Sequence, residues 1–128
     1  MSKISVAFFG AAVLYALLGM SLGMFMGATE DFTLAPVHAH INLLGWATLA
    51  LMGTFYGLAG DQAPTRLAWT NFAVSNLGNL ISLPLLAIML KGNKAYVPIM
   101  VGGEVLLVLG MAIFAVAVLS VARKPAMA

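Results

Sequence analysis

Four long apolar runs, separated by short polar segments, constrain the fold of this chain more than any other feature. They cover residues 5–27, 37–60, 67–90 and 95–121. Each reaches the roughly 20 residues that an α-helix needs to cross about 30 Å of hydrocarbon. Only 8% of the residues are charged, against roughly 25% in an average soluble domain. We therefore predict an all-α integral membrane protein with no nucleic-acid partner.

The segments between the runs are short and contain helix breakers. Residues 60–64 read Gly-Asp-Gln-Ala-Pro, and residues 92–94 read Gly-Asn-Lys. Short loops make consecutive helices antiparallel neighbours. We expect a single four-helix domain over residues 1–128, folded as an up-down bundle. The first run is too long for a signal peptide and no Ala-x-Ala site follows it, so we expect it to be retained as a helix.

The basic residues predict how the bundle is oriented. One end of the bundle would carry four basic residues, Lys3, Arg66, Arg123 and Lys124. The other end would carry two, Lys91 and Lys94. The loop over residues 28–33 is acidic and has no Lys or Arg. Positively charged loops favour the cytoplasmic side. We expect both termini in the cytoplasm, in a bacterial inner membrane.

The only two histidines, His38 and His40, stand at the opening of the second run. Imidazole is the commonest metal ligand in proteins. Residues two apart on an α-helix are separated by about 200°, so the two rings cannot bind one metal from the same helix. The pair therefore indicates a bound metal or heme, and a bis-histidine site would need a second protomer. The alternative is that both are polar residues of the membrane interface.

Other residues bear on the identity of the cofactor. The chain has no cysteine, which excludes covalent c-type heme attachment and thiolate metal sites. Asn42 lies on the same face as His38, one turn further in, where its amide would orient the ring or a cofactor edge. Trp46 is a second residue that we expect to lie beside the cofactor. Thioether ligation by a methionine of the first helix is a minor alternative, and its candidates are Met20, Met24 and Met26.

The first run carries a ridge of small residues. Tyr15, Gly19, Gly23 and Gly27 recur at every fourth position and therefore lie on one helix face. Glycine at this spacing lets another helix approach closely. We expect this face to pack within the protomer or between protomers.

The third run carries a polar stripe. Its members share one helix face and are Asn71, Ser75, Gly78, Asn79 and Ser82, with Asn76 beside them. Such a face points away from lipid. Interhelical hydrogen bonding is the expected role, and lining for a cofactor, water or proton path is the alternative. Pro84 predicts a kink in this helix.

Glu104 lies about nine residues inside the fourth run. A carboxyl group at that depth is costly unless it is paired, protonated or hydrated. We expect a partner such as Asn76, Asn79, water or a heme propionate, in either a structural role or a role in proton or propionate handling.

The segment from His40 to Trp46, His-Ile-Asn-Leu-Leu-Gly-Trp, resembles the second helix of subunit I of heme-copper oxidases, and especially of nitric oxide reductases. The whole chain is similar to small four-helix proteins assigned to that superfamily. Pro-Val-His-Ala-His-x-Asn-Leu-Leu-Gly-Trp at residues 36–46 and Asn-Leu-Gly at residues 76–78 carry the resemblance. Many of those proteins have His before the Asn-Leu-Gly, whereas this chain has Ser75.

The resemblance implies an assembly and a cofactor. Subunit I arranges twelve helices as three arcs of four, and one helix carries a His-x-His pair that serves two hemes. A four-helix chain would build a similar ring as a homotrimer, with heme b between His38 of one subunit and His40 of the next. A dimer sharing one heme is the competing assembly.

The same resemblance bears on activity. Oxygen- and nitric oxide-reducing members need additional histidines for a second metal, and this chain has none, so we expect no copper and no oxidase activity by the chain itself. Electron transfer with quinol or a periplasmic carrier is the expected function. A heme-based gas or redox sensor, a heme carrier and a cofactor-free accessory bundle are the alternatives.

Overall fold

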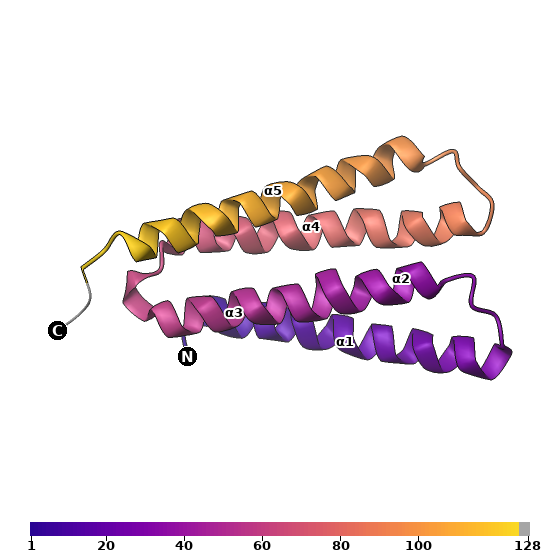
Figure 1. Cartoon of the computed structure of the whole chain (residues 1–128), viewed down its shortest axis with the longest axis horizontal. Coiled ribbons are helices and arrows are strands. Elements are labelled where there is room, and N and C mark those ends of the chain that lie inside the picture. Colours follow the sequence, from indigo (N-terminus) through magenta and orange to yellow (C-terminus); the bar gives the residue numbers. More distant parts are fainter. Residues whose placement is uncertain (126–128) are drawn as a thin grey trace.

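The computed structural model describes residues 1–125, and these form four antiparallel helical rods (Figure 1). The first rod is α1 (Lys3–Thr29), the third is α4 (Thr65–Leu90) and the fourth is α5 (Val97–Ala122). The second rod joins α2 (Ala35–His40), the π-helical segment η1 (Ile41–Ala47), α3 (Thr48–Ala59) and the short turn η2 (Gly60–Gln62). All four rods are long and apolar enough to cross a membrane. The prediction of an all-α four-helix bundle is confirmed.

The rods are arranged as two helical hairpins. α1 packs against the rod of α2, η1 and α3, and α4 packs along α5. α4 also contacts α1, α2 and η1, which joins the hairpins. Figure 1 shows the two hairpin loops at one end of the molecule, and the N-terminus and the α3–α4 connection at the other. This is the predicted up-down order, and the ends of the rods lie within two residues of the expected ones.

The densest part of the core is an aromatic cluster that joins both hairpins. Phe8 of α1 and Tyr56 of α3 are fully buried, and their ring centroids are 5.3 Å apart. Phe72 of α4 meets Phe8 edge to face at 5.2 Å, and Phe114 of α5 meets Phe55 of α3 in the same way. Such pairs add to the packing energy of buried rings. Four helices are therefore held together at the end of the bundle that lies opposite the hairpin loops.

Small residues bring α4 and α5 into close contact. A Cβ atom placed on Gly78 would lie 2.9 Å from the carbonyl oxygen of Gly103, and one placed on Gly110 would clash with Oγ of Ser75. The outer face of α5 is not covered by the described chain. Its exposed apolar side chains include Ile99, Val105, Val108, Leu109 and Leu119. This face is left for lipid or for another protomer.

The π-helical segment η1 departs from the regular α-helix expected over residues 37–60. The amide of Thr48 donates to the carbonyl oxygen of Leu43, five residues earlier, and Oγ1 of Thr48 donates to the same oxygen at 2.7 Å. The side-chain amide of Asn79 in α4 donates to the carbonyl oxygen of Leu44 at 3.2 Å. Polar side chains thus bind carbonyl groups where the helix is widened. Short π-helical segments occur frequently at functional sites.

Candidate functional site

His38 is half-buried at the seam between α2 and α1. Its Nδ1 atom lies 2.8 Å from the backbone carbonyl oxygen of Gly19. A carbonyl oxygen only accepts hydrogen bonds, so Nδ1 carries the proton in the neutral ring. The Nε2 atom then keeps its lone pair.

The glycine ridge of α1 forms the wall of a slot for this ring. A Cβ atom on Gly23 would lie 2.9 Å from Cε1 of His38, and one on Gly19 would lie 2.7 Å from Oδ1 of Asn42. Nothing lies within 4 Å of the corresponding position on Gly27. The ridge therefore does admit a close neighbour, and that neighbour is the helix that carries the histidines.

Asn42 occupies the position expected for it beside His38. Its Nδ2 atom donates to the backbone carbonyl oxygen of His38 at 3.0 Å and lies 3.5 Å from each ring nitrogen of that residue. The amide is thus fixed by the backbone and lies along one side of the ring. It restricts the ring orientation together with Gly23.

His40 lies on a different side of the helix and is exposed. Its Nδ1 atom lies 2.7 Å from the carbonyl oxygen of Pro36, one turn earlier in α2. By the same argument, Nδ1 donates and Nε2 is left with its lone pair. Both imidazoles are thus held in the same tautomer by backbone carbonyl groups. The sequence reasoning missed these two partners, although the i−4 position of Pro36 was a usable signal.

A groove of about 320 Å³ lies beside His40, between the second rod, α4 and α5. Apolar residues make up most of its lining, and the polar ones are His40, Ser82 and Glu104. Met111 of α5 lines the same groove. The fold thus brings His40 and Glu104 to one groove, a relationship that the sequence did not reveal.

The Nδ2 atoms of the two asparagines expected beside Glu104 donate to backbone carbonyl oxygens. Nδ2 of Asn76 donates to the carbonyl oxygen of Phe72 at 2.8 Å, and Nδ2 of Asn79 donates to Leu44. Glu104 itself is exposed at the edge of the groove. No hydrogen bond joins Glu104 to either asparagine within residues 1–125, and a pairing with water or a heme propionate stays a prediction.

Part of the polar stripe of α4 forms interhelical hydrogen bonds. Nδ2 of Asn71 donates to the hydroxyl oxygen of Tyr56 in α3 at 3.0 Å, and Oγ of Ser75 donates to Oδ1 of Asn71 at 3.1 Å. Asn71 and Ser75 are both buried. This network connects the two hairpins, which is the structural role expected for the stripe.

In the described chain, Trp46 and the methionines of α1 make no hydrogen bond with either imidazole. Trp46 is 39% exposed, and its side chain makes no hydrogen bond within residues 1–125. Met20 and Met24 are exposed and Met26 is buried. A role for any of them beside a cofactor stays a prediction.

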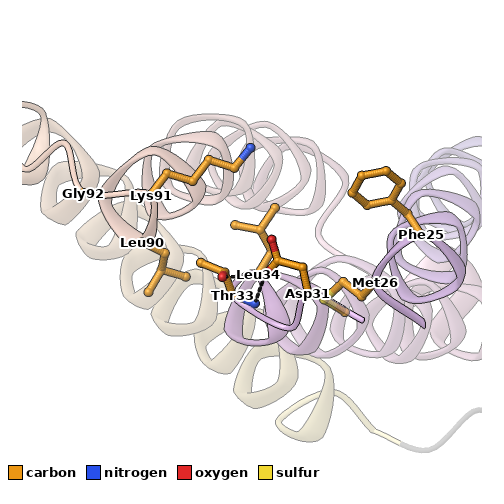
Figure 2. Close-up of a pocket in the computed structure, with 8 residues that line it drawn as sticks. All are labelled: Phe25, Met26, Asp31, Thr33, Leu34, Leu90, Lys91 and Gly92. Atoms are coloured by element: carbon orange, nitrogen blue, oxygen red, sulfur yellow. Dashed lines mark hydrogen bonds between the residues drawn. The ribbon is translucent and has the colours of Figure 1, made fainter. Parts of the chain in front are cut away.

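A cavity of about 620 Å³ lies at the hairpin-loop end of the bundle (Figure 2). Neither histidine lines it, but Met26, one of the thioether candidates, does. Asp31 from the α1–α2 loop and Lys91 from the end of α4 share its wall. The carboxylate of Asp31 accepts hydrogen bonds from Oγ1 of Thr33 at 2.6 Å and from the backbone amide of Thr33 at 3.0 Å. These bonds, together with the charge of Lys91, hold the pKa of Asp31 below its usual value.

Comparisons with protein-family models, with curated proteins and with solved structures find no match to this chain. Within residues 1–125, no group of three or more His, Cys, Asp or Glu side chains is placed to hold a metal ion. The candidate functional residues are the two histidines and the side chains around them.

Proposed function

We propose that this protein is a membrane b-type cytochrome related to subunit I of heme-copper oxidases, in which His38 and His40 are axial ligands and electron transfer is the activity. One observation carries the proposal: both rings donate from Nδ1 to a backbone carbonyl oxygen and keep the Nε2 lone pair. Histidines that bind a metal almost always have the second ring nitrogen fixed in this way. Two such rings in a chain with only two histidines favour ligation over a purely interfacial role.

The surroundings of the two imidazole rings support the proposal of a heme. His38 is held in a slot between Gly23 and Asn42, which restricts its rotation. His40 borders a mostly apolar groove in which Glu104 supplies a carboxyl group for holding a proton or contacting a propionate. Heme b would supply a one-electron Fe(III)/Fe(II) couple there. With both axial positions filled by imidazole, no position is left for a gas, and we propose neither copper nor oxidase activity for the chain alone.

The placement of the rings supports an oligomer. His38 lies against α1 and His40 lies beside α4 and α5, so one protomer cannot provide both ligands to one iron. In a closed ring of protomers, one contact between two different surfaces of the protomer is repeated around the ring. We propose a homotrimer in which His38 of one protomer and His40 of the next share a heme, with a dimer as the competing assembly. The exposed apolar face of α5 is available for lipid or for this contact.

The charge distribution supports a location and an orientation. The end of the bundle with the N-terminus and the α3–α4 connection carries Lys3, Arg66, Arg123 and Lys124, and the hairpin-loop end carries Lys91 and Lys94. We propose a bacterial inner membrane with the termini in the cytoplasm. The histidines would then lie toward the periplasmic side, within reach of quinol or a periplasmic electron carrier.

Visible spectroscopy of the protein purified in mild detergent tests the proposal. Sharp bands of reduced heme that carbon monoxide does not shift are expected. His38→Ala and His40→Ala should each abolish heme retention, whereas Met111→Leu, in the same groove as His40, should retain it. A colourless wild-type protein would contradict the proposal, as would heme retention in both histidine variants. A shift with carbon monoxide would favour a sensor or a heme carrier instead.

A further inference from the structure

Three hollows in the surface of the bundle adjoin one another beside α1 and α4. The first is the cavity of about 620 Å³ at the hairpin-loop end (Figure 2). Leu34 lines both this cavity and a groove of about 280 Å³ with almost wholly apolar walls. Tyr15, Leu18 and Leu80 line both that groove and a further apolar groove of about 280 Å³. The three hollows therefore form one run, which is polar at the hairpin-loop end and apolar beyond it.

The apolar part of this run opens to the outside of the bundle. Leu18 and Leu80, which line both grooves, are 60% and 64% exposed. Leu14, which lines the further groove, is 64% exposed. These leucines belong to helices that are long and apolar enough to cross a membrane, so their exposed faces meet lipid chains. An acyl chain can therefore enter the grooves from the side without passing through the protein.

The length of the run matches one leaflet of a bilayer. Leu90 lines the cavity, and Leu80, ten positions earlier in α4, lines both grooves. Ten residues of α-helix span about 15 Å, which is half of the roughly 30 Å of hydrocarbon in a bilayer. An acyl chain whose head group lies in the cavity would thus be followed by apolar walls over the depth of its own leaflet.

Two opposite charges line the cavity without forming an ion pair in the part of the chain that the structure describes. Asp31 comes from the α1–α2 loop and Lys91 from the end of α4, so the two hairpins provide one charge each (Figure 2). Both hydrogen bonds from Thr33 go to Oδ1 of Asp31, and Oδ2 has no protein partner within residues 1–125. These bonds lower the pKa of Asp31, which keeps it ionised at neutral pH. The cavity therefore presents one anion and one cation.

We propose that this run binds one molecule of phosphatidylethanolamine, with its ammonium group at Asp31, its phosphate at Lys91 and one acyl chain along α1 and α4. The head group carries one positive charge with N–H donors and one negative charge, which complements the two side chains. Phosphatidylglycerol has a phosphate for Lys91 but no cation for Asp31. A water-soluble zwitterion would leave the apolar grooves unfilled. The inference rests on the membrane location in the proposed function but not on heme.

Competition between two lipids tests this inference. The delipidated protein in detergent is mixed with equal amounts of dioleoyl phosphatidylethanolamine and dioleoyl phosphatidylglycerol, and native mass spectrometry counts the first lipid bound. We expect phosphatidylethanolamine to be preferred about fivefold, the ratio that corresponds to about 1 kcal/mol for one exposed charge pair. Equal occupancy, or a preference for phosphatidylglycerol, would overturn the proposal.

Variants of the two charged residues assign the preference. Asp31→Asn keeps an Oδ1 acceptor for Thr33 but removes the charge, so both lipids should bind equally. Lys91→Gln should weaken the binding of both lipids, because both carry a phosphate. Glu30→Gln and Lys94→Gln are the matched controls, since neither residue lines the cavity, and both should behave like the wild type. A preference that survives in Asp31→Asn, or that is lost equally in Glu30→Gln, would overturn the assignment.

A measurement on the wild-type protein covers the case in which Asp31→Asn does not fold. The chain has three tyrosines, and only Tyr15 lines the grooves, whereas Tyr56 is fully buried and Tyr96 lies before α5. In protein with ¹³C-labelled tyrosine, phosphatidylethanolamine with a nitroxide on one acyl chain should broaden the ring signals of Tyr15 more than those of Tyr56. It should also broaden them more than phosphatidylglycerol with the same label. Equal broadening of Tyr15 by the two lipids would contradict the site.

The outcomes of these experiments are separate from those of the heme measurements. A colourless protein that prefers phosphatidylethanolamine contradicts only the proposed function. A heme protein without a lipid preference contradicts only this inference.

Discussion

Gly23 of α1 directly faces the imidazole of His38, so closely that a Cβ atom on Gly23 would lie 2.9 Å from Cε1 of the ring. Real Cβ atoms essentially never make contacts this short. Gly23→Ala must therefore displace the ring and disturb its hydrogen bond to the carbonyl oxygen of Gly19. We expect a loss of roughly 1–3 kcal/mol in the free energy of unfolding, as for other overpacked sites, together with reduced heme retention.

Gly27→Ala is the matched control for this variant, because it adds the same methyl group to the same helix where nothing lies within 4 Å. Its stability should stay within about 0.5 kcal/mol of wild type. Unfolding in mixed micelles, followed by circular dichroism, measures both variants. Equal stabilities of Gly23→Ala and Gly27→Ala would show that the position of the His38 ring does not require a glycine at Gly23.

Tyr56→Phe should weaken the connection between the two hairpins. The hydroxyl oxygen of Tyr56 accepts a hydrogen bond from Nδ2 of Asn71 at 3.0 Å, and both residues are fully buried. Removing the oxygen leaves the amide without this partner. Hydrogen bonds between membrane helices contribute about 0.6 kcal/mol on average and up to about 1.7 kcal/mol. We expect a loss in that range, measured by the same unfolding titration.

Tyr96→Phe provides the comparison, since Tyr96 is 46% exposed and lies in the loop before α5. It should unfold like the wild type. A Tyr56→Phe variant as stable as Tyr96→Phe would mean that the bond to Asn71 contributes nothing measurable.

Asp31 should titrate below the usual range for aspartate. The main cause is the hydrogen bond from Oγ1 of Thr33, with smaller contributions from the backbone amide of Thr33 and the charge of Lys91. A lowered folded-state pKa stabilises the protein above the unfolded-state pKa, roughly 3.9, and this contribution is lost as the pH falls through the folded-state value. Thr33→Val should raise the pKa of Asp31 toward its ordinary value, as measured by carbon NMR of the carboxyl group.

Lys91→Gln should raise the same pKa by less, because the lysine makes the smallest of these contributions. A larger effect from Lys91→Gln than from Thr33→Val would contradict this order of causes.

The sequence predicts the rods well because bilayer thickness sets their length and the breakers at residues 60–64 and 92–94 set their ends. The glycine ridge also indicated a close helix neighbour. The identity of that neighbour, the rod with His38 and Asn42, follows only from the fold. Spacing alone, however, was sufficient to place His38 and His40 on different sides of their helix.

Other features depend on tertiary contacts that no local pattern encodes. The π-helical segment has its widened turn beside Asn79 of α4, and Gly45 within it packs against Tyr15 of α1. The environment of Glu104 depends on how α5 is rotated against α4, and Gly78 and Gly103 govern that contact. Sequence reasoning therefore identified Glu104 as a candidate but did not place it in the groove beside His40.

The π-helical segment has a further consequence for the angular position of the histidines. It lies between α2, which carries both rings, and α3, which is anchored in the aromatic cluster. A π-helical turn holds one residue more than an α-helical turn. If Ile41–Ala47 were a regular α-helix with the same number of residues, α2 would be turned relative to α3 by about 100°, the rotation per residue of an α-helix. His38 would then leave the glycines of α1. The direction in which each imidazole points is therefore set several residues away from the histidines, by the widened turn of this one segment.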